Sequence, residues 1–269
     1  MNLLVCCKIV PDLDRLSLGD WVIQDQGQID TAYVRNMINP FDESALELAL
    51  RLAEGAAPAG LTALTIGGRS ADPFLKTLLA LGFDRAVRLE TQADLRFCPE
   101  WIAALIAAYA ERGGGQEVLI LGRQSGVGDN AMTPLLVAEL LKRPCITEVI
   151  GLEPAAAGML RVTSQVDDGL LVQVVRPPLV LAVGNATGTA LRVPTLKARM
   201  LCAKQRIEVI DAASFDLEAV RERAAQDYAL EGMALISHLR AGRIVAGADA
   251  RATARMLYEE CLEQRLRSL

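Results

Sequence analysis

The stretch VLILGRQSGVGDNAMTPLLVAELLK, from Val118 to Lys142, contains the unit on which the expected fold depends. Val118 to Leu121 is an apolar run of strand length, and Leu135 to Lys142 has the composition of a helix that Thr133-Pro134 begins. The loop between them, Gly122 to Pro134, is rich in glycine. Such a loop, placed before a helix N-terminus, can bind phosphate through backbone N–H groups. This segment therefore predicts an α/β fold with a candidate anion site.

The same alternation of strands and helices covers the first part of the chain. Apolar runs predict strands at residues 3–7, 61–66, 86–89, 118–121 and 144–150. Apolar spacing and terminal Pro and Gly predict further helices at 72–81, 99–112 and 133–142, and one that Asn39 caps, Pro40 starts and Gly55 ends. The expected fold class is α/β, a doubly wound, mostly parallel sheet with helices on both faces. Ligands of such folds bind at the carboxyl ends of the strands, which predicts a site among loops 6–11, 66–69 and 122–133.

The pattern changes after residue 155. Leu160 to Val166 and Leu170 to Val175 flank Asp167-Asp168-Gly169, which predicts a β-hairpin. Leu179 to Val183 predicts one more strand, and the Gly/Thr-rich residues 184–195 that follow have no periodicity.

The last part of the chain has a different composition. Residues 211–269 are polar and rich in Arg and Glu, with amphipathic helical patterns near 216–228 and 249–267. These residues include too few apolar side chains to form a core of their own. We therefore expect one domain over residues 1–210 and a C-terminal helical arm over residues 211–269 that packs on a partner subunit.

Composition excludes several classes of function. The net charge of the 269 residues is −5 and no basic tract occurs, which argues against nucleic-acid binding. The six cysteines form no CxxC pair and His238 is the single histidine, so zinc or iron–sulfur ligation and Ser/His/Asp or Cys/His catalysis have little support. Cys6 and Cys7 are expected on opposite faces of a buried strand, as reduced core residues. No signal peptide or membrane-spanning run is recognisable, so we expect a cytoplasmic chain without stable membrane insertion.

The glycine-rich loop admits several interpretations. A Walker A loop is excluded, because its lysine and its spacing are absent. Gly126, Gly128 and Ala131 match the dinucleotide pattern GxGxxA, and Glu148 stands 20 residues after Gly128. However, this loop follows the fourth predicted strand instead of the first, so we interpret Glu148 as a coincidence of spacing. An anion-binding loop and an ordinary strand-to-helix turn both stay open.

A series of short motifs occurs in order along the chain. They are Cys6-Cys7-Lys8-x-Val10-Pro11-Asp12, Ile38-Asn39-Pro40-Phe41-Asp42-Glu43, Ala80-Leu81-Gly82-Phe83-Asp84-Arg85-Ala86, Gly122-x-Gln124-x-x-x-Gly128-Asp129, Asp167-Asp168-Gly169, Pro194-Thr195-Leu196-Lys197-Ala198, Ile207-Glu208-Val209 and Gly242-Arg243-Ile244-Val245-x-Gly247. Each motif is weak alone, but together they resemble the beta subunit of electron transfer flavoproteins, in particular its shorter bacterial, Fix-like members.

This resemblance implies a HUP-like adenine nucleotide-binding domain over residues 1–210. In that family the beta subunit forms a heterodimer with an FAD-carrying alpha subunit, and the complex passes electrons from a flavin dehydrogenase to an acceptor. The beta subunit binds AMP, or a second FAD in electron-bifurcating members. Because the flavin performs the redox chemistry, the resemblance implies an electron-transfer subunit without catalytic acid or base residues of its own, and not an enzyme.

The resemblance also implies which residues contact the nucleotide and the partner. The nucleotide positions are Cys6, Asn39, Pro40, Phe41, Asp42, Ile66, Gly122, Arg123, Gln124, Ser125, Gly126, Val127, Gly128, Asp129, Asn130 and Thr133. Residues 184–196 stand where the family has its partner-recognition loop. Leu191 and Val193 are the candidate apolar anchors there, and Lys197 lies just beyond.

The chain departs from the family pattern inside the nucleotide loop. Ordinary AMP-binding members have a run of Asp followed by Asn-Gln-Thr, where this chain has Val127-Gly128-Asp129 and Ala131-Met132-Thr133. The Gly-Asp-x-Ala pattern is nearer to members that hold FAD in this subunit, so both AMP and FAD are candidates. Two other functions are alternatives: a stand-alone adenine-nucleotide-binding regulatory protein, and an NAD-dependent dehydrogenase that rests on the GxGxxA match.

Overall fold

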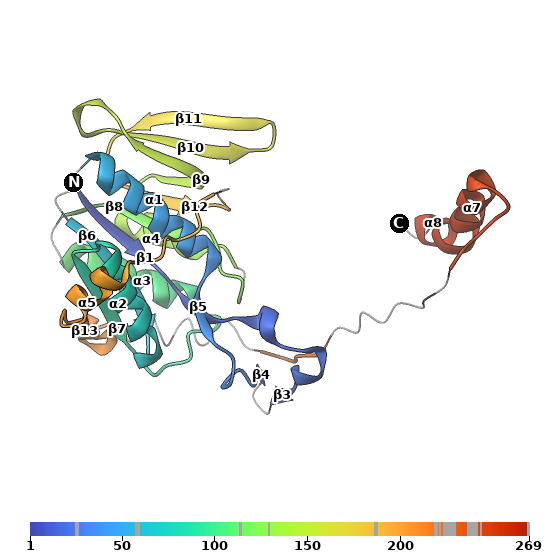
Figure 1. The fold of residues 1–269 in the computed structure, drawn as a ribbon, viewed down its shortest axis with the longest axis horizontal. Helices are drawn as coiled ribbons and strands as arrows, with labels where there is room; N and C mark the ends of the chain where they lie inside the picture. The colour runs from blue at the N-terminus through green and yellow to red at the C-terminus, as the bar shows by residue number, and fades with distance from the viewer. Residues whose placement is uncertain are drawn as a thin grey trace. The chain divides into compact units, whose positions relative to one another are not determined.

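A computed structural model describes residues 1–24, 27–56, 60–112, 115–128, 130–185, 188–217, 220, 222, 230–235, 242 and 244–267 (Figure 1). The chain divides into two compact units, Met1–Glu231 and Gly232–Leu269. The larger unit contains the sheet and its helices, and the smaller contains a C-terminal helical segment.

The described residues of the larger unit form a nine-stranded sheet in the order β11-β10-β9-β12-β8-β1-β6-β7-β13. Its strands are β1 (Asn2–Cys6), β6 (Gly60–Gly67), β7 (Arg85–Glu90), β8 (Gln116–Gly122), β9 (Cys145–Pro154), β10 (Leu160–Val166), β11 (Gly169–Val175), β12 (Leu179–Val183) and β13 (Glu208–Asp211). The pairings are parallel except those of β10, which is antiparallel to β9 and β11. This confirms the predicted α/β class, and β10 with β11 is the predicted hairpin.

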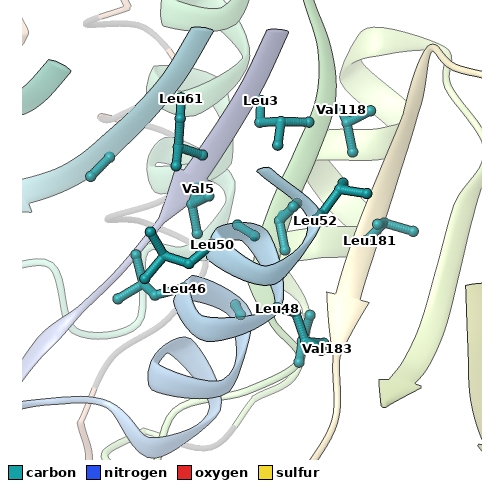
Figure 2. Close-up of a cluster of buried hydrophobic side chains, with 14 of the residues drawn as sticks. Leu3, Val5, Leu46, Leu48, Leu50, Leu52, Leu61, Val118, Leu181 and Val183 are labelled. Carbon is teal, nitrogen blue, oxygen red and sulfur yellow. The ribbon is translucent and has the colours of Figure 1, made fainter. Parts of the chain in front are cut away.

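Helices cover both faces of this sheet. Leucines of α1 (Pro40–Ala56) and α2 (Asp72–Leu81) pack on one face, where α1 crosses β1, β8 and β12 (Figure 2). The opposite face carries α3 (Pro99–Arg112) and α4 (Thr133–Leu141). Cys6 and Cys7 belong to the clusters on opposite faces, as the alternation of side chains along a strand predicts. The sheet is therefore doubly wound.

The strand order changes direction at β1. The chain adds β6 and β7 on one side of β1, and then returns to place β8 on the other side. The carboxyl ends of β1 and β8 thus meet at a topological switch point, where open α/β sheets bind their ligands. The predicted loop that follows Cys6 and the glycine-rich loop that begins at Gly122 both open at this edge of the sheet.

Short elements complete the larger unit. Two small two-stranded sheets pair β2 (Ile9–Pro11) with β5 (Asn36–Ile38), and β3 (Ile23–Gln24) with β4 (Gln28–Ile29). One short helix, α5 (Leu196–Cys202), follows the Gly/Thr-rich segment. Single 3-10 turns occupy Leu13–Arg15, Leu18–Asp20, Arg69–Ala71, Ala156–Gly158 and Ala212–Phe215.

Gly55 was expected to end the first helix, but α1 continues through Gly55 to Ala56, so that prediction is wrong by a residue or two. The helix predicted near 216–228 lies mostly outside the described residues. None of the described helices is both long and apolar enough to cross a membrane.

The smaller unit contains the helix predicted near 249–267. It begins as α7 (Ala250–Leu257), passes through a π-helical segment at Tyr258–Leu262, and ends as α8 (Glu263–Arg267). Asp249 caps α7, because its side chain accepts a hydrogen bond from the N–H of Ala252 at 2.7 Å.

The packing of α1 on the sheet predicts a large cost for shortening its leucines. Leu52 is 0% exposed, so Leu52→Ala should lower the free energy of unfolding by about 2–5 kcal/mol. Leu140 on α4 is 50% exposed, and Leu140→Ala should change it by no more than about 0.5 kcal/mol. Urea unfolding followed by circular dichroism measures both variants, and similar losses in the two would contradict this packing.

Candidate functional site

A buried carboxylate, that of Asp42, joins the two strands at the switch point. Asp42 lies in the first turn of α1 and is 6% exposed. Its Oδ2 accepts a hydrogen bond from the backbone N–H of Lys8 at 2.7 Å, and its Oδ1 accepts one from the N–H of Gly122 at 3.0 Å. Because Lys8 follows β1 and Gly122 ends β8, one side chain ties α1 to both strands.

The close approach of α1 requires a glycine at position 122. A Cβ on Gly122 would lie 2.3 Å from Oδ1 of Asp42 and 2.8 Å from the Cβ of Phe41. Only a residue without a side chain lets β8 end against the first turn of α1. The glycine predicted in the nucleotide loop therefore has a structural role of its own.

Asn39 connects α1 to the glycine-rich loop. Its backbone oxygen accepts hydrogen bonds from the N–H groups of Asp42 and Glu43, as expected at a helix start. Its side chain, however, does not cap the helix in the predicted way. The Nδ2 group donates to the carbonyl oxygen of Gln124 at 2.8 Å, and Oδ1 accepts from the N–H of Gly126 at 3.2 Å. The capping prediction is wrong for the side chain, because tertiary contacts with the loop use both of its polar atoms.

Further hydrogen bonds shape the loop itself. Ser125 Oγ accepts from the N–H of Val127 at 3.2 Å, and Lys8 Nζ donates to the Val127 carbonyl oxygen at 2.8 Å. Asn130 Oδ1 accepts from the N–H of Met132 at 3.1 Å. Lys8 was not predicted as a site residue, although a charge inside an apolar N-terminal run was a signal for it. Asp129 lies outside the described residues.

Arg123, the first residue after β8, has three neighbours at this edge. Its Nε donates to Gln124 Oε1 at 2.6 Å, its Nη1 pairs with Glu148 Oε1, and its guanidinium lies 5.7 Å from the centre of the Phe41 ring. The sequence-based interpretation of Glu148 as a coincidence of spacing is therefore incomplete: Glu148 is not a ribose ligand of a Rossmann first turn, but it contacts the loop directly.

The other predicted nucleotide residues lie at or near the same edge. Cys6 is buried at the end of β1, Pro40 is exposed at the start of α1, and Ile66 is half-buried near the end of β6. Gly128 adopts a φ of +96°, and Thr133 begins α4. Among the described residues, the hydrogen bonds of the loop include neither Ile66 nor the Thr133 hydroxyl. Over the same described residues, no group of three His, Cys, Asp or Glu side chains could hold a metal ion.

The segment after β12 is attached to α1 through Ser44 and Arg51. Thr189 Oγ1 and Ser44 Oγ are hydrogen-bonded at 2.9 Å, and both side chains are buried. Arg51 Nη2 donates to the carbonyl oxygen of Gly188 at 2.7 Å. These contacts hold the first part of the predicted partner-recognition loop on the helix.

An ion-pair network holds the second part of that segment. Arg192 pairs with Glu47 at 2.8 Å and also with Glu54, two residues of α1. Leu191 packs against the core beneath α1, whereas the side chain of Val193 is 78% exposed. Lys197 is also exposed, in α5. Of the two predicted apolar anchors, only Val193 presents a largely accessible side chain to the surroundings.

The buried position of Asp42 predicts a pH-dependent stability. Burial raises the pKa of this carboxyl to about 7, although hydrogen bonds from Lys8 and Gly122 oppose the rise. The folded protein therefore keeps this proton up to about pH 7, whereas the unfolded chain releases it near pH 4. The protonated carboxyl contributes its full share to the free energy of unfolding below about pH 4, and this contribution is lost as the pH rises through about 7. The Asp42→Asn variant should be less stable by about 1–3 kcal/mol, because its amide faces a backbone N–H. Its stability should also fall less than that of the wild type between pH 5 and pH 8.

Urea unfolding at several pH values measures this difference. Asp84→Asn is the matched control, since that exposed carboxylate also accepts a backbone hydrogen bond, from Leu61 at 2.8 Å. The control should keep the wild-type pH profile, and an unchanged profile in Asp42→Asn would contradict the assignment.

Two kinds of comparison relate this chain to known proteins. The family model described as the electron transfer flavoprotein domain matches residues 26–215. The chain is 37% identical over 211 residues to the Escherichia coli K12 protein YgcR, which is named as an electron transfer flavoprotein subunit; the match covers 77% of this chain and 80% of YgcR.

Two further relatives have similar coverage. The chain is 29% identical to the electron transfer flavoprotein subunit beta of Syntrophomonas wolfei, over 80% of this chain and 81% of the relative. It is 27% identical to the acryloyl-CoA reductase electron transfer subunit gamma of Anaerotignum propionicum, over 78% of each chain. With a family match that covers most of the chain and a nine-stranded doubly wound sheet, this protein belongs to the electron transfer flavoprotein family, as a beta-type member.

Proposed function

We propose that this chain is the beta subunit of a heterodimeric electron transfer flavoprotein, in which an alpha subunit carries FAD. Membership of the family supports electron transfer as its role and flavin as the redox group of the complex. The FAD supplies the electron-accepting chemistry. This chain binds a nucleotide and presents docking surfaces, and it is not itself an enzyme. Its six free cysteines are typical of a reducing compartment, so we propose a cytoplasmic complex.

The nucleotide site proposed for this subunit lies at the carboxyl ends of β1 and β8. The observation that carries the proposal is the network in which Asn39 and Asp42 fasten the start of α1 to the loop at the topological switch point. The N–H groups of Gly126, Val127 and Met132 are used inside the loop. The phosphate is therefore bound by the N–H groups of Gly128, Asn130, Ala131 and Thr133, at the N-terminus of α4.

The ligand proposed for this site is an adenine nucleotide, either AMP or a second FAD. Val127 and Gly128 stand where the usual AMP loop has aspartates, so the loop carries less negative charge against a phosphate or diphosphate. Cys6 and Ile66, at the ends of neighbouring strands, lie where the adenosine contacts the sheet. Both ligands suit this arrangement, and a count of bound nucleotides separates them.

The proposed docking surface for the donor flavin dehydrogenase is the segment from Gly188 to Lys197. Attachment to Ser44, Glu47 and Arg51 of α1 fixes its backbone. The segment presents the exposed side chain of Val193 beside the cationic Lys197. A rigid loop with one exposed apolar side chain suits recognition, because little conformational entropy is lost on binding.

The proposed partner of the C-terminal arm is the alpha subunit. In this proposal the domain over residues 1–210 provides the nucleotide site and residues 211–269 form the arm, although Ala212 lies in the core of the larger unit and Phe215, Leu217 and Val220 pack against it. In the described part of that arm, large apolar side chains are exposed along the helical segment, namely those of Leu257, Tyr258, Leu262 and Leu266. A helix with such a surface is stabilised by burying it against another chain.

Co-expression tests the heterodimer. The chain expressed alone should be insoluble or unstable, because the apolar surface of the arm is uncovered. Co-expression with an alpha-type subunit should give a yellow complex with the visible spectrum of a flavin. After denaturation, the complex should release FAD together with a second adenine nucleotide: one FAD and one AMP identify the AMP form, and two FAD identify the other. A colourless, monodisperse monomer without nucleotide would contradict the proposal.

Asn39 tests the nucleotide site. The Asn39→Ala variant leaves the part-buried carbonyl oxygen of Gln124 and N–H of Gly126 without their partners, which should destabilise the fold by about 1–3 kcal/mol. It should also weaken binding of the nucleotide by about 10-fold or more, because the loop loses its attachment. Asn36→Ala removes an exposed asparagine nearby and is the matched control. Calorimetric titration measures affinity, and equal affinity in both variants would exclude this loop as the site.

A further inference from the structure

Glu148 reaches the switch-point edge through a set of unusual backbone features. The pairing of β9 with β12 aligns Leu181 with Ile146 and Val183 with Val149, so Thr147 and Glu148 stand opposite one residue. This is a β-bulge in a parallel pair, a rare position for one, and bulges of this kind re-aim side chains next to functional sites. Glu148 itself has a φ of +52°, which is uncommon for a residue with a side chain.

A glycine in the adjacent strand end makes room for this side chain. A Cβ on Gly184 would lie 2.9 Å from Oε2 of Glu148 and 3.4 Å from its Cα. The N–H of Gly184 also donates to the carbonyl oxygen of Val149 at 2.9 Å, which holds the end of β12 beside the bulge. The carboxylate of Glu148 reaches the switch-point edge of the sheet because of the bulge, its positive φ and the space left by Gly184. A local conformation that costs this much free energy is typical of functional sites.

The group that this carboxylate meets is the guanidinium of Arg123. Glu148 binds Nη1, Gln124 binds Nε at 2.6 Å, and the ring of Phe41 lies 5.7 Å away. The contacts come from β9, from the loop and from α1, so the fork of Arg123 is oriented from three sides. Within the described residues, Nη2 makes no hydrogen bond to the protein, and its two N–H groups are able to donate to a ligand.

We propose that Arg123 donates through Nη2 to a phosphate oxygen of the bound nucleotide, and that Glu148 is the positioning residue that orients Arg123 for this contact. The inference rests on the proposed nucleotide site and adds a charged side chain to its backbone donors. An arginine fork binds phosphate oxygens with a directed hydrogen bond, which suits a diphosphate as well as a monophosphate. Glu148 does not contact the nucleotide.

The sign of the Glu148 effect follows from two opposing terms. Its negative charge repels the phosphate, but Arg123 stands between them and both side chains are more than one-third exposed, so solvent screens this repulsion. Loss of Glu148 frees a long side chain whose rotamers must then be fixed on binding. The second effect is the larger, and removal of Glu148 weakens binding.

The experiment uses the full-length chain in complex with its co-expressed alpha subunit. Variants Arg123→Gln, Glu148→Gln and the double variant are titrated calorimetrically with AMP, ADP and FAD. Arg123→Gln should weaken binding of the preferred nucleotide by about 10-fold or more, and Glu148→Gln by a smaller factor. The double variant should bind as Arg123→Gln does, because Glu148 acts only through Arg123.

Two readouts separate this role from a merely structural one. The affinity of the wild type should fall as salt rises, and Arg123→Gln should flatten that dependence. Thermal unfolding should be unchanged in Glu148→Gln, because a half-exposed ion pair adds little stability. Glu139→Gln, on the exposed surface of α4, is the matched control and should bind like the wild type.

The outcomes distinguish this inference from the function on which it rests. Wild-type binding with unchanged affinity in Arg123→Gln, or with tighter binding in Glu148→Gln, would overturn the inference alone and leave the nucleotide site in place. Losses in the two single variants that add in the double variant would also overturn it. A wild-type complex that binds none of the three nucleotides would overturn both proposals.

Discussion

One buried carboxylate organises the functional edge of this protein. Asp42 accepts backbone hydrogen bonds from Lys8, two residues after β1, and from Gly122, the last residue of β8. It therefore joins the two strands at the point where the strand order reverses. This constraint sets the position of α1 against both strands and excludes any side chain at Gly122. It also brings Asn39 within reach of the glycine-rich loop, whose backbone it holds. The loop is therefore shaped by the start of α1 as much as by its own glycines.

The helix α1 connects two parts of the molecule with different proposed roles. Its first turn contacts the switch point, and a stripe further along contacts the segment after β12, through Ser44, Glu47, Arg51 and Glu54. Their spacing of three and four residues places these side chains on one face of the helix. Its buried leucines fix α1 on the sheet (Figure 2). The candidate nucleotide site and the candidate docking segment are thus attached to the same rigid element.

Local patterns were sufficient for the fold and for part of the site. Apolar runs located the strands of the sheet except the edge strand β13, which was not predicted. Proline and glycine located α2, α3 and α4 to within a residue or two, because these signals act through neighbouring residues. The loop after β8 was predicted from its glycines and from its motif. Three site contacts were not predictable in this way: those of Lys8 with Val127, of the Asn39 side chain with the loop, and of Glu148 with Arg123. Each contact joins residues more than twenty positions apart, and the spacing of apolar residues along the sequence does not indicate which distant residues will pair.

The sequence by itself determined the α/β class, the hairpin, the glycine-rich loop and the family resemblance, since all of these depend on residue type and on short spacing. Only the tertiary structure decided which polar groups meet at the switch point. A β-bulge and a positive φ turned Glu148 toward the loop, and the strand order brought Lys8, Asp42 and Gly122 to one place. The physical reason is that hydrogen bonds between distant segments depend on strand order and register, and both are properties of the whole sheet.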